Sequence, residues 1–103
     1  SEKPFFSVKR GQTVVIRMIN NTAFPHAMHL HGHHIRAVNH IRVTRRGEQE
    51  LEVQRDWRDS ILIQRGEVLQ VAFVADNPGK WMLHCHMLEH QAGGMMTWFE
   101  VTV

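Results

Sequence analysis

Apolar and polar residues alternate in several short segments of the chain, which is the pattern of β-strands with one buried face. The two clearest segments are residues 13–19 and 68–75, each preceded by a basic residue and a glycine. Their predicted inward-facing residues are Val14, Ile16 and Met18 in the first and Leu69, Val71 and Phe73 in the second. Each segment therefore predicts a strand that contributes one face to a core.

Five further segments are extended. They are an apolar run after Gly32 through residues 35–38, an edge strand at 50–53 with Leu51 and Val53 inward, and strands at 61–64, 82–86 and 97–103, the last with Phe99, Val101 and Val103 on one face. Turn-forming residues separate them, as in a charged turn around Gly47 and in Asp76-Asn77-Pro78-Gly79. Helical periodicity is confined to a possible turn at 87–91. About seven short strands with this spacing predict an all-β Greek-key β-sandwich.

Length and composition fit one domain that spans residues 1–103. The formal net charge of +2 is too small, and the basic residues too dispersed, to predict nucleic-acid binding. Since no segment approaches the roughly 20 apolar residues of a membrane span, we expect a soluble protein that does not bind membranes. The single cysteine rules out an internal disulfide. The chain begins at Ser1 without a signal peptide, so we expect that it was excised from a longer protein or lost upstream domains.

Potential metal ligands gather near the C-terminus, in the segment Trp81-Met82-Leu83-His84-Cys85-His86-Met87-Leu88-Glu89-His90-Gln91-Ala92-Gly93-Gly94-Met95. Blue-copper electron-transfer sites use two imidazoles and one thiolate in a plane, with a weak thioether ligand above it. Cys85, His90 and Met95 provide three of these ligands at equal steps of five residues. The fourth ligand has to be a histidine from a distant part of the fold.

Strand geometry predicts a second metal site behind the first. Successive side chains of a strand point to opposite faces, so His84 and His86 would face away from a copper bound by Cys85. A second histidine run, His26-Ala27-Met28-His29-Leu30-His31-Gly32-His33, offers partners. Its residues His29 and His31 have the same spacing of two and could meet His84 and His86. His26, further back in the loop, is the natural fourth ligand of the blue site.

These two motifs resemble those of the C-terminal copper-binding cupredoxin domain of multicopper oxidases, the laccase and copper-resistance oxidase family. The second motif matches the family pattern of HCH, three residues, H, four residues and M completely. The first departs only at Ala27, where the family usually has proline, and this removes no ligand. The resemblance extends from about Lys9 to the end of the chain and implies a cupredoxin-like fold.

The resemblance also implies a role for each ligand. It assigns His26, Cys85, His90 and Met95 to a type 1 copper, His29 to a type 2 copper, and His31, His84 and His86 to a type 3 copper pair. The family builds its trinuclear cluster from eight histidines, four from each of two domains. Because this chain supplies four, we expect a second cupredoxin domain or an identical subunit to complete the cluster, which makes a homo-oligomer the expected assembly.

The reaction that the resemblance implies is the four-electron reduction of oxygen to water. A small reducing substrate would donate electrons to the type 1 copper, and Cys85 with its neighbours His84 and His86 would carry them to the trinuclear cluster. The resemblance further implies a periplasmic or secreted protein. Gln91 stands where some relatives have a carboxylate, and it cannot deliver protons by ionising, whereas Glu89 lies on the other side of His90 and would point elsewhere.

Several alternatives remain open at this level. The chain could be a single-domain blue-copper electron carrier with a partial rear site, whereas a structural zinc module is disfavoured because it does not need Met95. Asp59, in a segment Trp57-Arg58-Asp59-Ser60 that also resembles the family, could orient a ligand histidine or form a turn. We assign no role to His33, His34 and His40, although His33 is the best placed to lie near the cluster. Trp81 and Trp98 are interpreted as packing residues.

Overall fold

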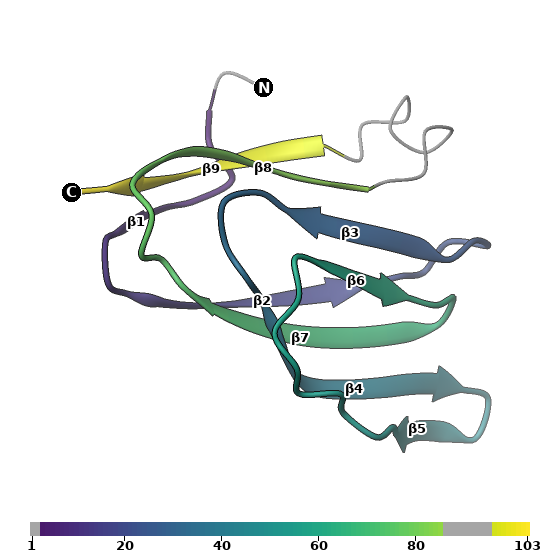
Figure 1. Cartoon of the computed structure of the whole chain (residues 1–103). Coiled ribbons are helices and arrows are strands. Elements are labelled where there is room, and N and C mark those ends of the chain that lie inside the picture. Colours follow the sequence, from purple (N-terminus) through teal and green to yellow (C-terminus); the bar gives the residue numbers. More distant parts are fainter. Residues whose placement is uncertain (1–2, 86–95) are drawn as a thin grey trace.

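Two β-sheets form the computed structural model of the chain (Figure 1), which describes residues 3–85 and 96–103 apart from the side chains of Cys85 and Met96. The five-stranded sheet has the order β1-β9-β8-β3-β6 and the four-stranded sheet the order β2-β7-β4-β5. The strands are β1 (Ser7–Lys9), β2 (Thr13–Ile19), β3 (His26–Leu30), β4 (Arg36–Thr44), β5 (Gly47–Glu50), β6 (Ser60–Ile63), β7 (Glu67–Val74), β8 (Gly79–Cys85) and β9 (Met96–Thr102). The all-β class predicted from sequence is confirmed.

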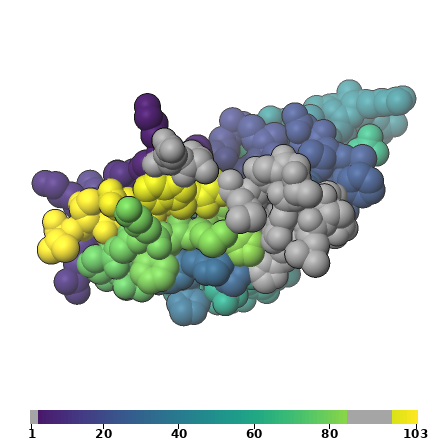
Figure 2. All heavy atoms as spheres, turned by 90° about the horizontal axis from the view of Figure 1, so that it is seen from above, coloured from purple at the N-terminus to yellow at the C-terminus, as the bar shows by residue number. Residues whose placement is uncertain are grey.

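Neighbouring strands pair antiparallel except β1, which runs parallel to β9 through Ser7–Lys9. The β8–β9 pair extends from Gly79 opposite Val101 to His84 opposite Met96. These two strands lie side by side on the face seen in Figure 2, with β8 in green and β9 in yellow. Of the described residues of the two predicted ligand motifs, His84 and Cys85 lie in β8, His26 and His29 lie in β3 next to it, and His31 and His33 follow β3.

The core lies between the two sheets and is built by the alternation that the sequence predicts. In β7, Leu69, Val71 and Phe73 are at most 1% exposed, whereas Val74 is 44% exposed. The five-stranded sheet contributes Leu30, Ile63, Leu83, Phe99 and Val101 from the opposite side. Val14 and Met18 pack against this cluster and Ile16 is part of it, as predicted for β2. Alternation along each strand therefore settles which face is buried.

Two details of the prediction are wrong. The edge strand is β5, residues Gly47–Glu50, because the tight turn at Arg45 and Arg46 folds the chain back at once onto β4. Residues 51–53 are thus not part of a strand, although Val53 still packs against the core. Val103 is 98% exposed, since pairing in β9 ends at Thr102.

The structure also has more strands than the seven or so predicted, with nine in the described residues. One additional strand is β3, which precedes Gly32 and lies in the other sheet from β4, the strand that follows Gly32. The other addition, β1, follows Phe6, whose ring stacks on that of Phe99 with centroids 5.0 Å apart. Phe5, in contrast, is 63% exposed.

No helix occurs among the residues that the structure describes, and the possible helical turn at 87–91 lies outside them. Consequently, no described helix has the length and apolar character needed to cross a membrane.

Candidate metal centre

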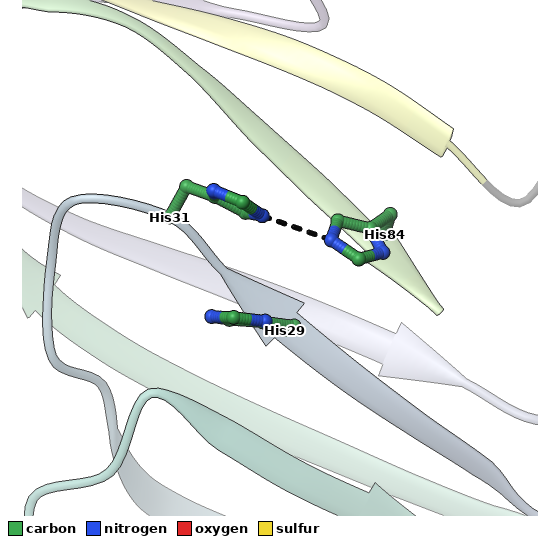
Figure 3. A group of neighbouring side chains, drawn as sticks. All are labelled: His29, His31 and His84. Carbon is green, nitrogen blue, oxygen red and sulfur yellow. Dashed lines mark hydrogen bonds between the residues drawn. The ribbon is translucent and has the colours of Figure 1, made fainter. Parts of the chain in front are cut away.

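Three histidine rings converge on the outer face of the five-stranded sheet (Figure 3). His29, His31 and His84 each offer one ring nitrogen, and these nitrogens all lie within 4.8 Å of one another. The Nε2 atoms of His31 and His84 are 2.9 Å apart, and the rings of His29 and His31 stack with centroids 4.6 Å apart. Imidazole nitrogens suit copper, zinc, iron and nickel, so the donor set fits a transition metal.

Pairing between β3 and β8 places His29 and His84 together. The two residues lie directly opposite each other in the antiparallel register, which puts their side chains on the same face of the sheet. Their neighbours Leu30 and Leu83 form the next pair and are buried on the opposite, inner face. Both histidines therefore point away from the core of the chain, where they stay partly exposed.

His31 follows the end of β3 and is held by a turn. Its backbone N–H donates a hydrogen bond to the Met82 carbonyl at 2.9 Å. The next residue, Gly32, has a φ of +77°, and a Cβ at this position would lie 2.6 Å from the Trp81 ring. Glycine is required here both for the left-handed backbone and for the close approach of the indole. Trp81 is therefore a packing residue, as predicted, and it supports the turn that carries His31.

His26 lies on the other side of the same sheet. It is only 4% exposed, and it shares the inner face of β3 with Met28 and Leu30. Its Nε2 is 2.8 Å from the Thr22 hydroxyl. His26, which the sequence analysis places in the loop before the motif, is thus the first residue of β3, and its side chain lies on the opposite face of the sheet from His29 and His84.

The remaining predicted ligands lie at the end of β8 or outside the described residues. The backbone of Cys85 pairs with Met28 next to the His29–His84 pair, but its side chain is not described. His86, His90 and Met95 lie outside the described residues, as do Glu89 and Gln91.

Asp59 lies close to the cluster formed by His29, His31 and His84. Its Oδ2 is 3.9 Å from Nε2 of His29, which is too long for a direct hydrogen bond. The Asp59 carbonyl accepts a hydrogen bond from the Leu30 N–H at 2.9 Å, so its backbone anchors the end of β3. This backbone contact supports a role for Asp59 in the turn before β6 more directly than a role in orienting His29.

The three unassigned histidines lie outside the cluster. His33 is buried among the rings of Phe73, Trp81 and Phe99, with its Nδ1 3.2 Å from the His31 carbonyl oxygen. It is thus next to the cluster in the chain but packs into the core. His34 is exposed. His40 places Nε2 3.0 Å from Oε1 of Glu67.

Glu67 is a buried carboxylate that sequence analysis missed. Burial raises the pKa of Glu67, but the Gln64 N–H, the His40 ring and the Arg42 guanidinium together hold its pKa below the ordinary value. The Gln64 N–H donates to Oε1 at 2.7 Å, and Arg42 Nη2 donates to Oε2 at 3.3 Å. The carboxylate ties β4 to the start of β7 in the four-stranded sheet, whereas His29 and His84 belong to the five-stranded sheet, so its role is structural.

Comparison with known proteins shows which family has sequences similar to this chain. Residues 1–103 match the sequence profile of the multicopper oxidase family. Laccase-1 of Fomitopsis schrenkii is 35% identical over 95 residues, which cover 90% of this chain and 17% of that protein.

Two solved structures show the same fold. A multicopper oxidase from Campylobacter jejuni, a metallo-oxidase, is 30% identical with a TM-score of 0.83, covering 99% of this chain and 21% of its own. A blue copper oxidase from Nitrosomonas europaea is 31% identical with a TM-score of 0.79, and the match covers 97% of this chain and 31% of that protein. These matches confirm the cupredoxin-like sandwich. The chain spans less than a third of each of these three proteins.

Proposed function

Because the chain belongs to the multicopper oxidase family, we propose that it carries a type 1 copper site and half of the ligands of an oxygen-reducing trinuclear copper cluster. The observation that carries this proposal is the convergence of His29, His31 and His84 on one outer face of the sheet. In this proposal His29 binds the type 2 copper, and His31 and His84, with His86, bind the type 3 pair.

The exposure of the cluster supports its completion by a partner. The rings of His29, His31 and His84 are partly buried and face away from the core of their own domain. Within the described part of the chain, no other histidine, cysteine or acidic residue joins them as a metal-binding group. A second cupredoxin domain or an identical subunit can therefore approach this face and add the missing ligands.

His26 forms the described part of the proposed type 1 site, together with Cys85, His90 and Met95. A copper held by two imidazoles, a thiolate and a thioether supplies single-electron transfer with little rearrangement of its ligands. His26 is only 4% exposed, so the fold keeps its ring largely out of water. The peptide bond between His84 and Cys85 joins the rear cluster to the proposed thiolate ligand, so β8 provides a short covalent connection between the two sites.

The substrates and setting follow from the same proposal. A small reducing substrate donates electrons, oxygen accepts them, and neither nucleic acid nor a membrane takes part. The protein is periplasmic or secreted, in line with the resemblance stated above. Its whole-protein activity depends on the parts that complete the cluster.

The double substitution His29→Ala and His31→Ala tests this function. It should abolish oxygen reduction while the blue absorption of the type 1 site remains, because the two histidines lie on the opposite face from His26. His34→Ala is the matched control, since His34 is exposed and outside the cluster. Retained oxidase activity in the double variant would refute the proposal. A wild-type protein that is blue but does not reduce oxygen would instead be a single-domain electron carrier.

A further inference from the structure

We propose that Thr22 is a positioning residue for His26, and that its hydroxyl fixes which ring nitrogen of His26 is available to bind metal. The proposal deepens the function above, because it rests on His26 as a type 1 ligand. It starts from one contact: the Thr22 hydroxyl oxygen lies 2.8 Å from Nε2 of His26.

Asn20, which is only 4% exposed, is hydrogen-bonded on every polar atom of its side chain. Its amide nitrogen donates to the carbonyl oxygens of Phe24 at 2.8 Å and Ile63 at 3.0 Å. Its amide oxygen accepts the Thr22 backbone N–H at 3.0 Å. Both amide hydrogens and the oxygen thus have partners of the correct polarity, which determines the orientation of this amide. Asn20 Oδ1 is therefore an acceptor that faces Thr22.

The Thr22 hydroxyl has a single proton to donate, and its neighbours decide where that proton goes. Oγ1 lies 2.6 Å from Asn20 Oδ1 and 3.1 Å from the Phe24 carbonyl oxygen, and neither oxygen can donate. If the hydroxyl donated to His26, its lone pair would face the Asn20 oxygen at 2.6 Å without a hydrogen between them. The proton therefore goes to Asn20, and the hydroxyl accepts a hydrogen bond from Nε2–H of His26.

The consequence concerns the tautomer of His26. A neutral imidazole protonated on Nε2 carries its lone pair on Nδ1, and a metal bound by His26 is then bound through Nδ1. Hydrogen bonds to the second nitrogen of a ligand histidine also fix the direction of the ring. Asn20 connects this small network to β6 through the Ile63 carbonyl, so the ring of His26 is anchored to the core of the domain.

The variants Thr22→Val and Thr22→Ser test the proposal on the copper-loaded protein. Valine keeps the shape of threonine and removes the hydroxyl, whereas serine keeps the hydroxyl. We expect T22V to weaken retention of the type 1 copper against a chelator by about ten- to hundredfold, as is typical for partners of ligand histidines. It should also change the blue absorption and the reduction potential. T22S should stay close to the wild type.

Thr44→Val is the matched control, because it removes a hydroxyl that donates to the Gly47 carbonyl in the β4–β5 hairpin. T44V should leave the blue site unchanged. The proposal is overturned if T22V retains copper and absorbs as the wild type does, or if T22S loses as much as T22V. If the wild type never shows the blue absorption, the proposed type 1 copper site is refuted. The role of Thr22 toward His26 is then tested by a second measurement.

That measurement is the nitrogen-15 NMR spectrum of the wild-type His26 ring in the metal-free chain at a pH where imidazole is neutral. It also decides the case if T22V does not fold. A proton on Nε2 is the expected result, and a proton on Nδ1 would overturn the proposal.

Discussion

His31 and His84 are 53 residues apart in the sequence, yet their Nε2 atoms lie 2.9 Å apart on the outer face of the five-stranded sheet. His84 is placed by the pairing of β8 with β3, and His31 by the turn that follows β3. The first prediction concerns what this arrangement does to stability. Copper bound only by the folded protein should raise the free energy of unfolding, by about 2.7 kcal/mol at a free concentration one hundred times the dissociation constant. Thermal unfolding with and without copper measures the shift.

His31→Ala should lose part of this copper-dependent shift, because it removes one nitrogen from the cluster. His34→Ala should keep all of it, since that exposed ring lies outside the cluster. Equal shifts in wild type and H31A would show that the three histidines do not bind copper together.

The turn after His31 provides a second prediction. Gly32→Ala introduces a Cβ 2.6 Å from the Trp81 ring at a φ of +77°, so we expect it to destabilise the fold by about 1–3 kcal/mol from overpacking in addition to backbone strain. Gly11→Ala separates the two effects, because Gly11 has a φ of +93° but open space where its Cβ would lie. Denaturant unfolding should show a larger loss for G32A than for G11A. Equal losses would mean that Trp81 does not hold this turn.

Glu67 makes stability depend on pH. Its pKa is lower in the folded protein than the ordinary value of 4.5, so the carboxylate stabilises the fold fully above that value. This contribution is lost as the pH falls through the lower, folded-state pKa. Glu67→Gln should therefore cost about 1–3 kcal/mol at neutral pH, and the cost should shrink in acid.

Denaturant unfolding of wild type and E67Q between neutral and acidic pH checks this expectation. Glu48→Gln, at an exposed position in β5, is the control and should show little change at any pH. A cost for E67Q that stays constant across the range would contradict the charged role of Glu67.

Much of this arrangement could be predicted from the sequence because it depends on alternation. The spacing of two predicts that His29 and His31 lie together and can meet His84, and these three rings do converge. The sequence predicts His26 in the loop before the motif, whereas it is the first residue of β3. Alternation does not determine which residue of the second motif lies opposite His29, and it is the pairing of β3 with β8 that places His84 there.

Other features depend on contacts between distant segments, which alternation does not reveal. Asn20 and Thr22 look like ordinary turn residues in the sequence, and only the folded turn brings the Thr22 hydroxyl to His26. His33 follows a ligand motif but packs against rings from β7, β8 and β9. The position of β5 depends on a two-residue turn at Arg45 and Arg46, where charged residues gave no clear strand boundary.

The central claim is that the rear histidines form half of a copper cluster that a second domain or subunit completes. Copper analysis of the assembled protein, with its mass measured in solution, tests this claim most directly. We predict more than one copper per type 1 site in the wild type, and loss of the additional copper with retention of the blue colour when His29, His31 and His84 are all replaced by alanine. A wild-type protein that binds a single copper for each type 1 site, unchanged by these substitutions, would contradict it.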